Sequence, residues 1–89
     1  MVITLRYYAA ASAAAGVESE RLEVPEDATL ASALEAARAV VRSPGPDAPG
    51  LEEVLRRCSY LVNEVAARDP KRRLADGDLV DVLPPFAGG

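Results

Sequence analysis

The chain ends in the stretch Leu79-Val80-Asp81-Val82-Leu83-Pro84-Pro85-Phe86-Ala87-Gly88-Gly89. Its first five residues follow the turn signal Asp76-Gly77-Asp78 and are mostly apolar, which predicts a strand over 79–83. Pro84 and Pro85 remove two backbone donors and would end this strand. We therefore expect one folded domain over 1–83 and an extended tail over 84–89.

The Gly88-Gly89 end suits a peptide that must enter a narrow slot, because glycine has no side chain and takes backbone angles closed to other residues. The terminal carboxylate of Gly89 reacts weakly by itself. ATP can convert it to an acyl-adenylate, a mixed anhydride that sulfur or nitrogen can attack. The tail residues, at about 3.3 Å each, reach roughly 20 Å from the domain. The prolines would stiffen its base, and Phe86, the only phenylalanine, would be its apolar anchor.

The rest of the chain alternates between strand and helix patterns. Strands are predicted over 2–8 and 18–24, each with apolar side chains on one face. An alanine-rich segment over 9–15 predicts a short helix that Gly16 would end. After a loop over 43–50 with three prolines and two glycines, we expect a short helix over 51–57 and a strand over 59–64.

The main helix is predicted to begin after Thr29, a suitable N-cap. Apolar residues then recur at helical spacing as Leu30, Ala33, Leu34, Ala37 and Val41,. This stripe would cover one face of a mixed sheet, so the sequence predicts an α+β fold. The expected core consists of Ile3, Leu5, Tyr7, Leu30, Leu34, Val41, Val80 and Val82. Within it, Leu34→Ala is expected to cost roughly 2–5 kcal/mol of stability.

The composition argues against several classes of function. The chain has no histidine that could activate Cys58, its only cysteine, so we expect a small buried thiol and not a nucleophile,. A single cysteine fits the reducing cytoplasm, and no metal-ligand spacing is found. The net charge of −4 disfavours a nucleic-acid partner,. No apolar run approaches the roughly 20 residues of a membrane span. Asp76 and Asp78 are expected to hydrogen-bond the local backbone.

The whole chain resembles the small subunit of molybdopterin synthase, the MoaD family of sulfur carriers. The matching segments are Tyr7-Tyr8-Ala9, the short helix to Gly16, the Val62-Asn63 step, the Asp76-Gly77-Asp78 turn and the end from Val80 to Gly89. The resemblance implies a ubiquitin-like β-grasp fold with a flexible Gly-Gly tail. The 43–50 loop departs from it as an expected surface insertion, and the basic turn at 71–73 is a second departure.

The resemblance also implies a sulfur cycle. An activating enzyme of the MoeB type would use ATP to adenylate Gly89. A sulfur donor such as a rhodanese or a cysteine desulfurase would then convert it to a thiocarboxylate. With Gly88 and Gly89 inside the MoaE-type large subunit, the tail would give sulfur to cyclic pyranopterin monophosphate. The carrier would bind no cofactor and would not be an enzyme by itself, because the large subunit supplies the acid-base residues.

Alternation along the strands predicts where these partners bind. In a β-grasp sheet the first and last strands are parallel neighbours, so Tyr8 and Leu83 face away from the helix if Leu5 and Val82 face it. Together with Phe86 they would form an apolar patch that leads into the tail. The residues expected to contact the large subunit and the activating enzyme are Tyr8, Leu83, Pro84, Pro85, Phe86 and Ala87.

Three alternatives stay open. The same fold could carry sulfur for cysteine or thiamine biosynthesis, although thiamine carriers are generally shorter and lack the double proline. The chain could instead be a ubiquitin-like protein modifier, joined through Gly89 to a lysine of a target. It could also be a plain interaction domain, which would tolerate a blocked C-terminus.

Overall fold

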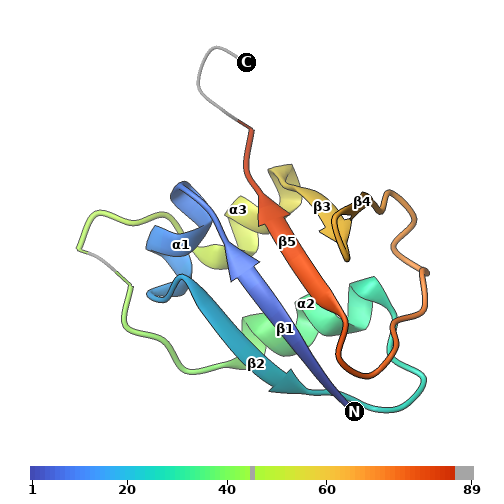
Figure 1. The fold of residues 1–89 in the computed structure, drawn as a ribbon. Helices are drawn as coiled ribbons and strands as arrows, with labels where there is room; N and C mark the ends of the chain where they lie inside the picture. Colours follow the sequence, from blue (N-terminus) through green and yellow to red (C-terminus); the bar gives the residue numbers. More distant parts are fainter. Residues whose placement is uncertain (45, 86–89) are drawn as a thin grey trace.

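A computed structural model describes residues 1–44 and 46–85. It contains one mixed sheet of five strands in the order β2-β1-β5-β3-β4, with helices packed against one face (Figure 1). The strands are β1 (Val2–Tyr7), β2 (Ser19–Glu23), β3 (Ser59–Val62), β4 (Val65–Ala66) and β5 (Leu79–Leu83). The helices are α1 (Ala10–Ala15), α2 (Leu30–Ala39) and α3 (Leu51–Arg57). The predicted α+β class is confirmed.

The centre of the sheet is the parallel pair of β1 and β5, whose arrows point the same way in Figure 1. Leu5 lies beside Val80, and Tyr7 lies beside Val82. Strands β2 and β3 flank this pair, each antiparallel to its neighbour. Because side chains alternate along a strand, this register places every second residue of β1 and β5 on the helix side.

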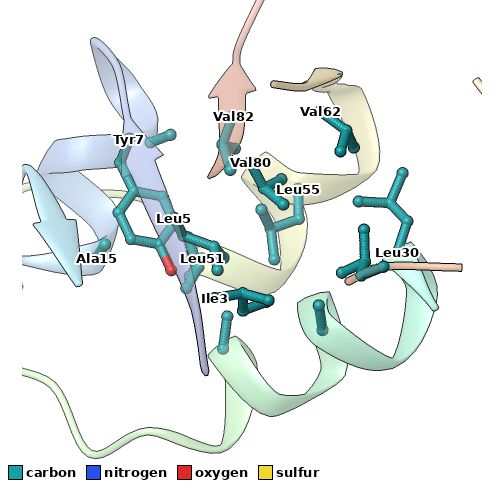
Figure 2. Close-up of a cluster of buried hydrophobic side chains, with 14 of the residues drawn as sticks. Ile3, Leu5, Tyr7, Ala15, Leu30, Leu51, Leu55, Val62, Val80 and Val82 are labelled. Atoms are coloured by element: carbon teal, nitrogen blue, oxygen red, sulfur yellow. The ribbon is translucent and has the colours of Figure 1, made fainter. Parts of the chain in front are cut away.

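The core lies between that side of the sheet and the helices (Figure 2). Ile3, Leu5, Val80 and Val82 are each 0% exposed, and they meet side chains from α2 and α3. Tyr7 and Leu30 are also buried as predicted. Burying such a side chain contributes about 1.5–3 kcal/mol. Three further members come from α3, which the sequence predicted as a helix but not as part of the core: Leu51, Val54 and Leu55.

Two residues of the predicted helix stripe behave differently. Helix α2 ends at Ala39, and Val41 is 98% exposed, so its placement in the core was wrong. The helical spacing no longer applies at Val41, because Val40 is already extended at φ −70° and ψ 134°. Arg42, the next residue, donates to the Ala37 carbonyl at 2.7 Å and to Glu20 of β2 at 3.1 Å. The side chain of Arg42 thus faces the domain, whereas the side chain of Val41 before it faces solvent. Leu34 packs against the core but is only partly buried.

Local signals at the helix ends were interpreted correctly. Thr29 caps α2 in a reciprocal capping box with Ser32,. Gly16 ends α1 in the left-handed region at φ 79°. A Cβ added there would lie 2.8 Å from the carbonyl oxygen of Ser43. Glycine is therefore required at this point both by backbone conformation and by the loop that crosses it.

The strand predicted over 59–64 is shorter than expected. It ends at Val62, and a tight turn through Asn63 and Glu64, both at positive φ, leads into the two-residue strand β4. Two left-handed residues in succession are typical of a hairpin turn whose twist matches the sheet. The sequence carried no glycine there to mark the turn.

A bilayer-spanning helix is absent from residues 1–44 and 46–85, where the longest helix has 10 residues.

Candidate functional site: the end of β5 and the open face of the sheet

The point where the chain leaves the sheet lies beside Tyr8. The amide of Tyr8 donates to the Val82 carbonyl at 3.3 Å, which extends the pairing of β1 and β5 by one residue. Leu5 and Val82 face the helices, so Tyr8 and Leu83 lie on the opposite, open face, as alternation predicts. Tyr8 is 38% exposed and Leu83 is half-buried. Two large apolar groups thus stand next to the start of the tail.

The predicted tail begins against the domain. Pro84 is buried and Pro85 is exposed. Both prolines line a hollow of about 230 Å³, whose other lining residues are Ala10, Pro49, Glu53, Val54 and Arg57. The chain therefore leaves β5 beside a hollow that residues of α1 and α3 also line. The predicted site residues Phe86, Ala87, Gly88 and Gly89 lie outside the described residues.

The centre of the open face carries an ion pair that was not predicted from the sequence. Arg6 Nε donates to Asp81 Oδ1 at 2.6 Å, and Arg6 Nη2 donates to Asp81 Oδ2 at 3.0 Å. The Tyr8 hydroxyl donates to Asp81 Oδ1 at 3.3 Å. Asp81 is only 3% exposed. Its hydrogen bonds raise the pKa of Arg6, so the guanidinium stays charged. The available signal was one charged residue in the middle of each of two otherwise strand-like segments.

The turn over 76–78 lies at the other end of β5 and forms hydrogen bonds through both of its carboxylates. Asp78 accepts from the local amide of Ala75 at 2.8 Å, as predicted, and from Asn63 Nδ2 at 2.9 Å. Asp76 instead accepts from the amide of Val2 at 2.7 Å, across the sheet. The prediction of a local bond is therefore confirmed for Asp78 and wrong for Asp76. Asp76 thus links this turn to β1, and Asp78 links it to the turn between β3 and β4, at the end of the sheet remote from the tail.

Cys58 follows α3 and is half-buried. Its thiol donates to the Val54 carbonyl at 3.2 Å, and it lines an open hollow of about 640 Å³ with Leu34 and Tyr60. Burial raises the pKa of the thiol to about 11. Since the thiolate is the reactive form, this cysteine is held in its inert state at neutral pH.

We expect Cys58 in the folded protein to react with iodoacetamide near pH 8 about a hundredfold more slowly than in the urea-unfolded chain. A pKa near 11 instead of 9 lowers the thiolate fraction by about that factor,. Intact mass measured over time gives both rates, and the unfolded chain is the matched control. Equal rates would show that the thiol is freely accessible and ionisable.

Comparisons with known proteins identify a family and a relative that match along almost the whole chain. The sequence matches the ThiS family over residues 5–89. It is 30% identical to the molybdopterin synthase sulfur carrier subunit of Chlamydomonas reinhardtii, over 90 residues that cover 100% of both chains.

Two solved structures are also similar. The H. volcanii small archaeal modifier protein 1 superposes with a TM-score of 0.72 at 25% identity, over 96% of this chain and 98% of that one. A chain in the complex of subunits 1 and 2 of the molybdopterin-converting factor from Helicobacter pylori 26695 gives a TM-score of 0.62 at 25% identity, over 100% of both chains. The fold is thus the ubiquitin-like β-grasp that the resemblance implied.

Proposed function

This chain belongs to the ThiS family, and on that premise we propose that it is the sulfur-carrier subunit of a molybdopterin synthase. The observation that carries the proposal is its 30% identity to a sulfur carrier subunit along the full length of both chains. The geometry supports it, because Pro84 and Pro85 lead away from a rigid parallel strand pair and the sequence continues to Gly88-Gly89.

The reacting group in this proposal is the carboxylate of Gly89. An activating enzyme of the MoeB type joins it to the AMP part of ATP and releases pyrophosphate. A sulfur donor, such as a rhodanese or a cysteine desulfurase, then supplies a persulfide whose terminal sulfur attacks the carbonyl carbon and displaces AMP. A thiol reduces the resulting acyl disulfide to the thiocarboxylate and leaves as the disulfide with the donor. The thiocarboxylate gives its sulfur to cyclic pyranopterin monophosphate, and water supplies the oxygen that restores the carboxylate. The chain is then a substrate in every step and not a catalyst.

The catalytic groups in this scheme come from the partners. Among residues 1–44 and 46–85 the one thiol, Cys58, has a raised pKa, and the turn carboxylates are engaged in backbone hydrogen bonds. The large subunit is of the MoaE type. A similar chain comes from a complex between subunits 1 and 2 of the Helicobacter pylori converting factor, which supports a two-subunit assembly.

Intact mass of the chain isolated from its host tests the function. A thiocarboxylate replaces one oxygen by sulfur and adds about 16 Da, and this increase should disappear when the activating enzyme is deleted. Only the unmodified mass, under conditions in which the host makes the molybdenum cofactor, would contradict the proposal.

A second candidate function is protein modification through Gly89, which the likeness to the small archaeal modifier protein favours. It uses the same adenylate but ends in an amide bond to a lysine. Branched Gly-Gly peptides in a digest of host proteins would reveal it. The two functions are therefore separated by one mass-spectrometric experiment on the same cells.

We expect the large subunit and the activating enzyme to bind the same apolar groups, Tyr8, Leu83 and Phe86, and so to exclude each other. Aromatic anchors at an interface centre commonly cost 2 kcal/mol or more when truncated, which is about thirtyfold in affinity. Calorimetry of Tyr8→Ala, Leu83→Ala and Phe86→Ala with the purified large subunit measures the loss of affinity. Competition between the large subunit and the activating enzyme for the wild-type chain measures the exclusion. Wild-type affinity in all three folded variants would place the interface elsewhere.

A further inference from the structure

The open face of the sheet combines an apolar border with a charged centre. The half-buried side chains of Leu61, Leu79 and Leu83 border the ion pair of Arg6 and Asp81 on the side of β5 and β3. On the side of β2, Ser19 lies beside Arg6. We call this surface, with Tyr8, the docking face. Leu83 leads directly into Pro84, so this face is continuous with the start of the tail.

The ion pair is asymmetric. Asp81 is almost fully buried, with a side chain 4% exposed, whereas the side chain of Arg6 is 41% exposed. Asp81 takes up two donors of the guanidinium, through Nε and Nη2. A guanidinium has five N–H donors. Nη1 and one N–H of Nη2 have no hydrogen-bond partner among residues 1–44 and 46–85.

Stability does not explain this pair. Replacing a buried ion pair with apolar residues of similar volume is often neutral or stabilising. An apolar pair in the centre of the docking face would also enlarge a hydrophobic contact surface. Conversely, a wholly apolar partner on the present face would remove water from the N–H groups of Arg6 that Asp81 does not bind. It would provide no hydrogen-bond acceptor in place of that water, which costs free energy.

We propose that Arg6, held in place by Asp81, is a specificity-determining residue of the docking face, which fits a partner with one hydrogen-bond acceptor at the centre of an otherwise apolar contact surface. This inference rests on the proposed function, in which that partner is the large subunit of molybdopterin synthase. The acceptor is an uncharged oxygen, from a carbonyl or a hydroxyl group. Asp81 already balances the charge of Arg6, and a second carboxylate would repel it.

The experiment compares the wild-type chain with the double variant Arg6→Met/Asp81→Leu in calorimetric titrations against the purified large subunit. Both replacements are apolar, Met is close to Arg in volume, Leu has the branched shape of Asp, and together they leave the net charge unchanged. The matched control is Glu52→Leu/Arg56→Met, which removes an exposed ion pair of α3, away from the docking face. A melting curve of each variant confirms that it is folded.

We expect the Arg6→Met/Asp81→Leu variant to bind at least tenfold more weakly and the α3 control to bind like the wild type. The tenfold difference should persist at high salt, because screening weakens a contact between charges far more than a hydrogen bond to a neutral oxygen. Unchanged affinity of the docking-face variant would overturn the inference. A difference that vanishes at high salt would overturn the uncharged acceptor.

The same titration separates this inference from the function on which it rests. If wild type binds and Leu83→Ala weakens binding, but Arg6→Met/Asp81→Leu does not, only the role of Arg6 falls. If the wild-type chain does not bind the large subunit at all, both the proposed function and the inference fall. An unfolded double variant is replaced by Arg6→Met/Asp81→Asn, which also removes both charges but keeps the side-chain volume at position 81 and an acceptor for the Tyr8 hydroxyl, with the same expected loss and the same contradicting result.

Discussion

A chain that lacks Gly89, or one that carries an extra residue after it, should lose sulfur transfer and keep its fold. The core that the structure describes ends in sequence at Val82, so we expect either change to leave the fold intact. The proposed reaction requires the terminal carboxylate at a fixed point in the partner, and a displacement near 1 Å can cost about a hundredfold in rate. Formation of the thiocarboxylate with purified activating enzyme and sulfur donor, followed by intact mass, measures the loss.

The control for this prediction is the same extra residue inserted after Asp47, in the exposed loop over 43–50. This insertion lengthens the chain equally but leaves the tail unchanged, so it should load with sulfur like the wild type. Gly88→Ala tests how narrow the slot is in which the activating enzyme receives the tail, because an added Cβ there should impair activation. Full cofactor synthesis by an extended chain that is not trimmed would refute the carrier function.

Leu5→Ala should lower the free energy of unfolding by about 2–5 kcal/mol, a large share of what so small a domain has. Leu5 is 0% exposed at the centre of the sheet, beside Val80 and under the helices, so little can move to fill the cavity. Leu34→Ala, for which the sequence suggested the same loss, should cost clearly less. Leu34 is only partly buried and already borders an open hollow.

Urea unfolding followed by circular dichroism gives both free energies, with Leu34→Ala as the internal control for an equal change in side-chain volume. Equal losses in the two variants would show that α2 packs more closely on the sheet than the structure indicates. A Leu5→Ala chain as stable as the wild type would contradict the assignment of β1 to the centre of the core.

Most of the elements of the fold could be predicted because they depend on near neighbours in the sequence. The alternation of Ile3, Leu5 and Tyr7, the capping residue Thr29 and the proline stop after Leu83 each act within a few positions. For the candidate site, alternation also placed Tyr8 and Leu83 on the open face. The role of Gly88 and Gly89 stays a prediction from the sequence.

Tertiary structure decided what depends on residues far apart in the chain. The pair of Arg6 and Asp81 joins positions 75 residues apart, and only the parallel register of β1 and β5 brings them together. Arg42 meets Glu20 from 22 residues away, and the preceding Val41 is exposed although its spacing fits the helix stripe. The sequence by itself determined which segments become strands and helices, since propensities and caps are local. The charged centre of the docking face arises only when the sheet assembles, because neither residue has the other as a neighbour until then.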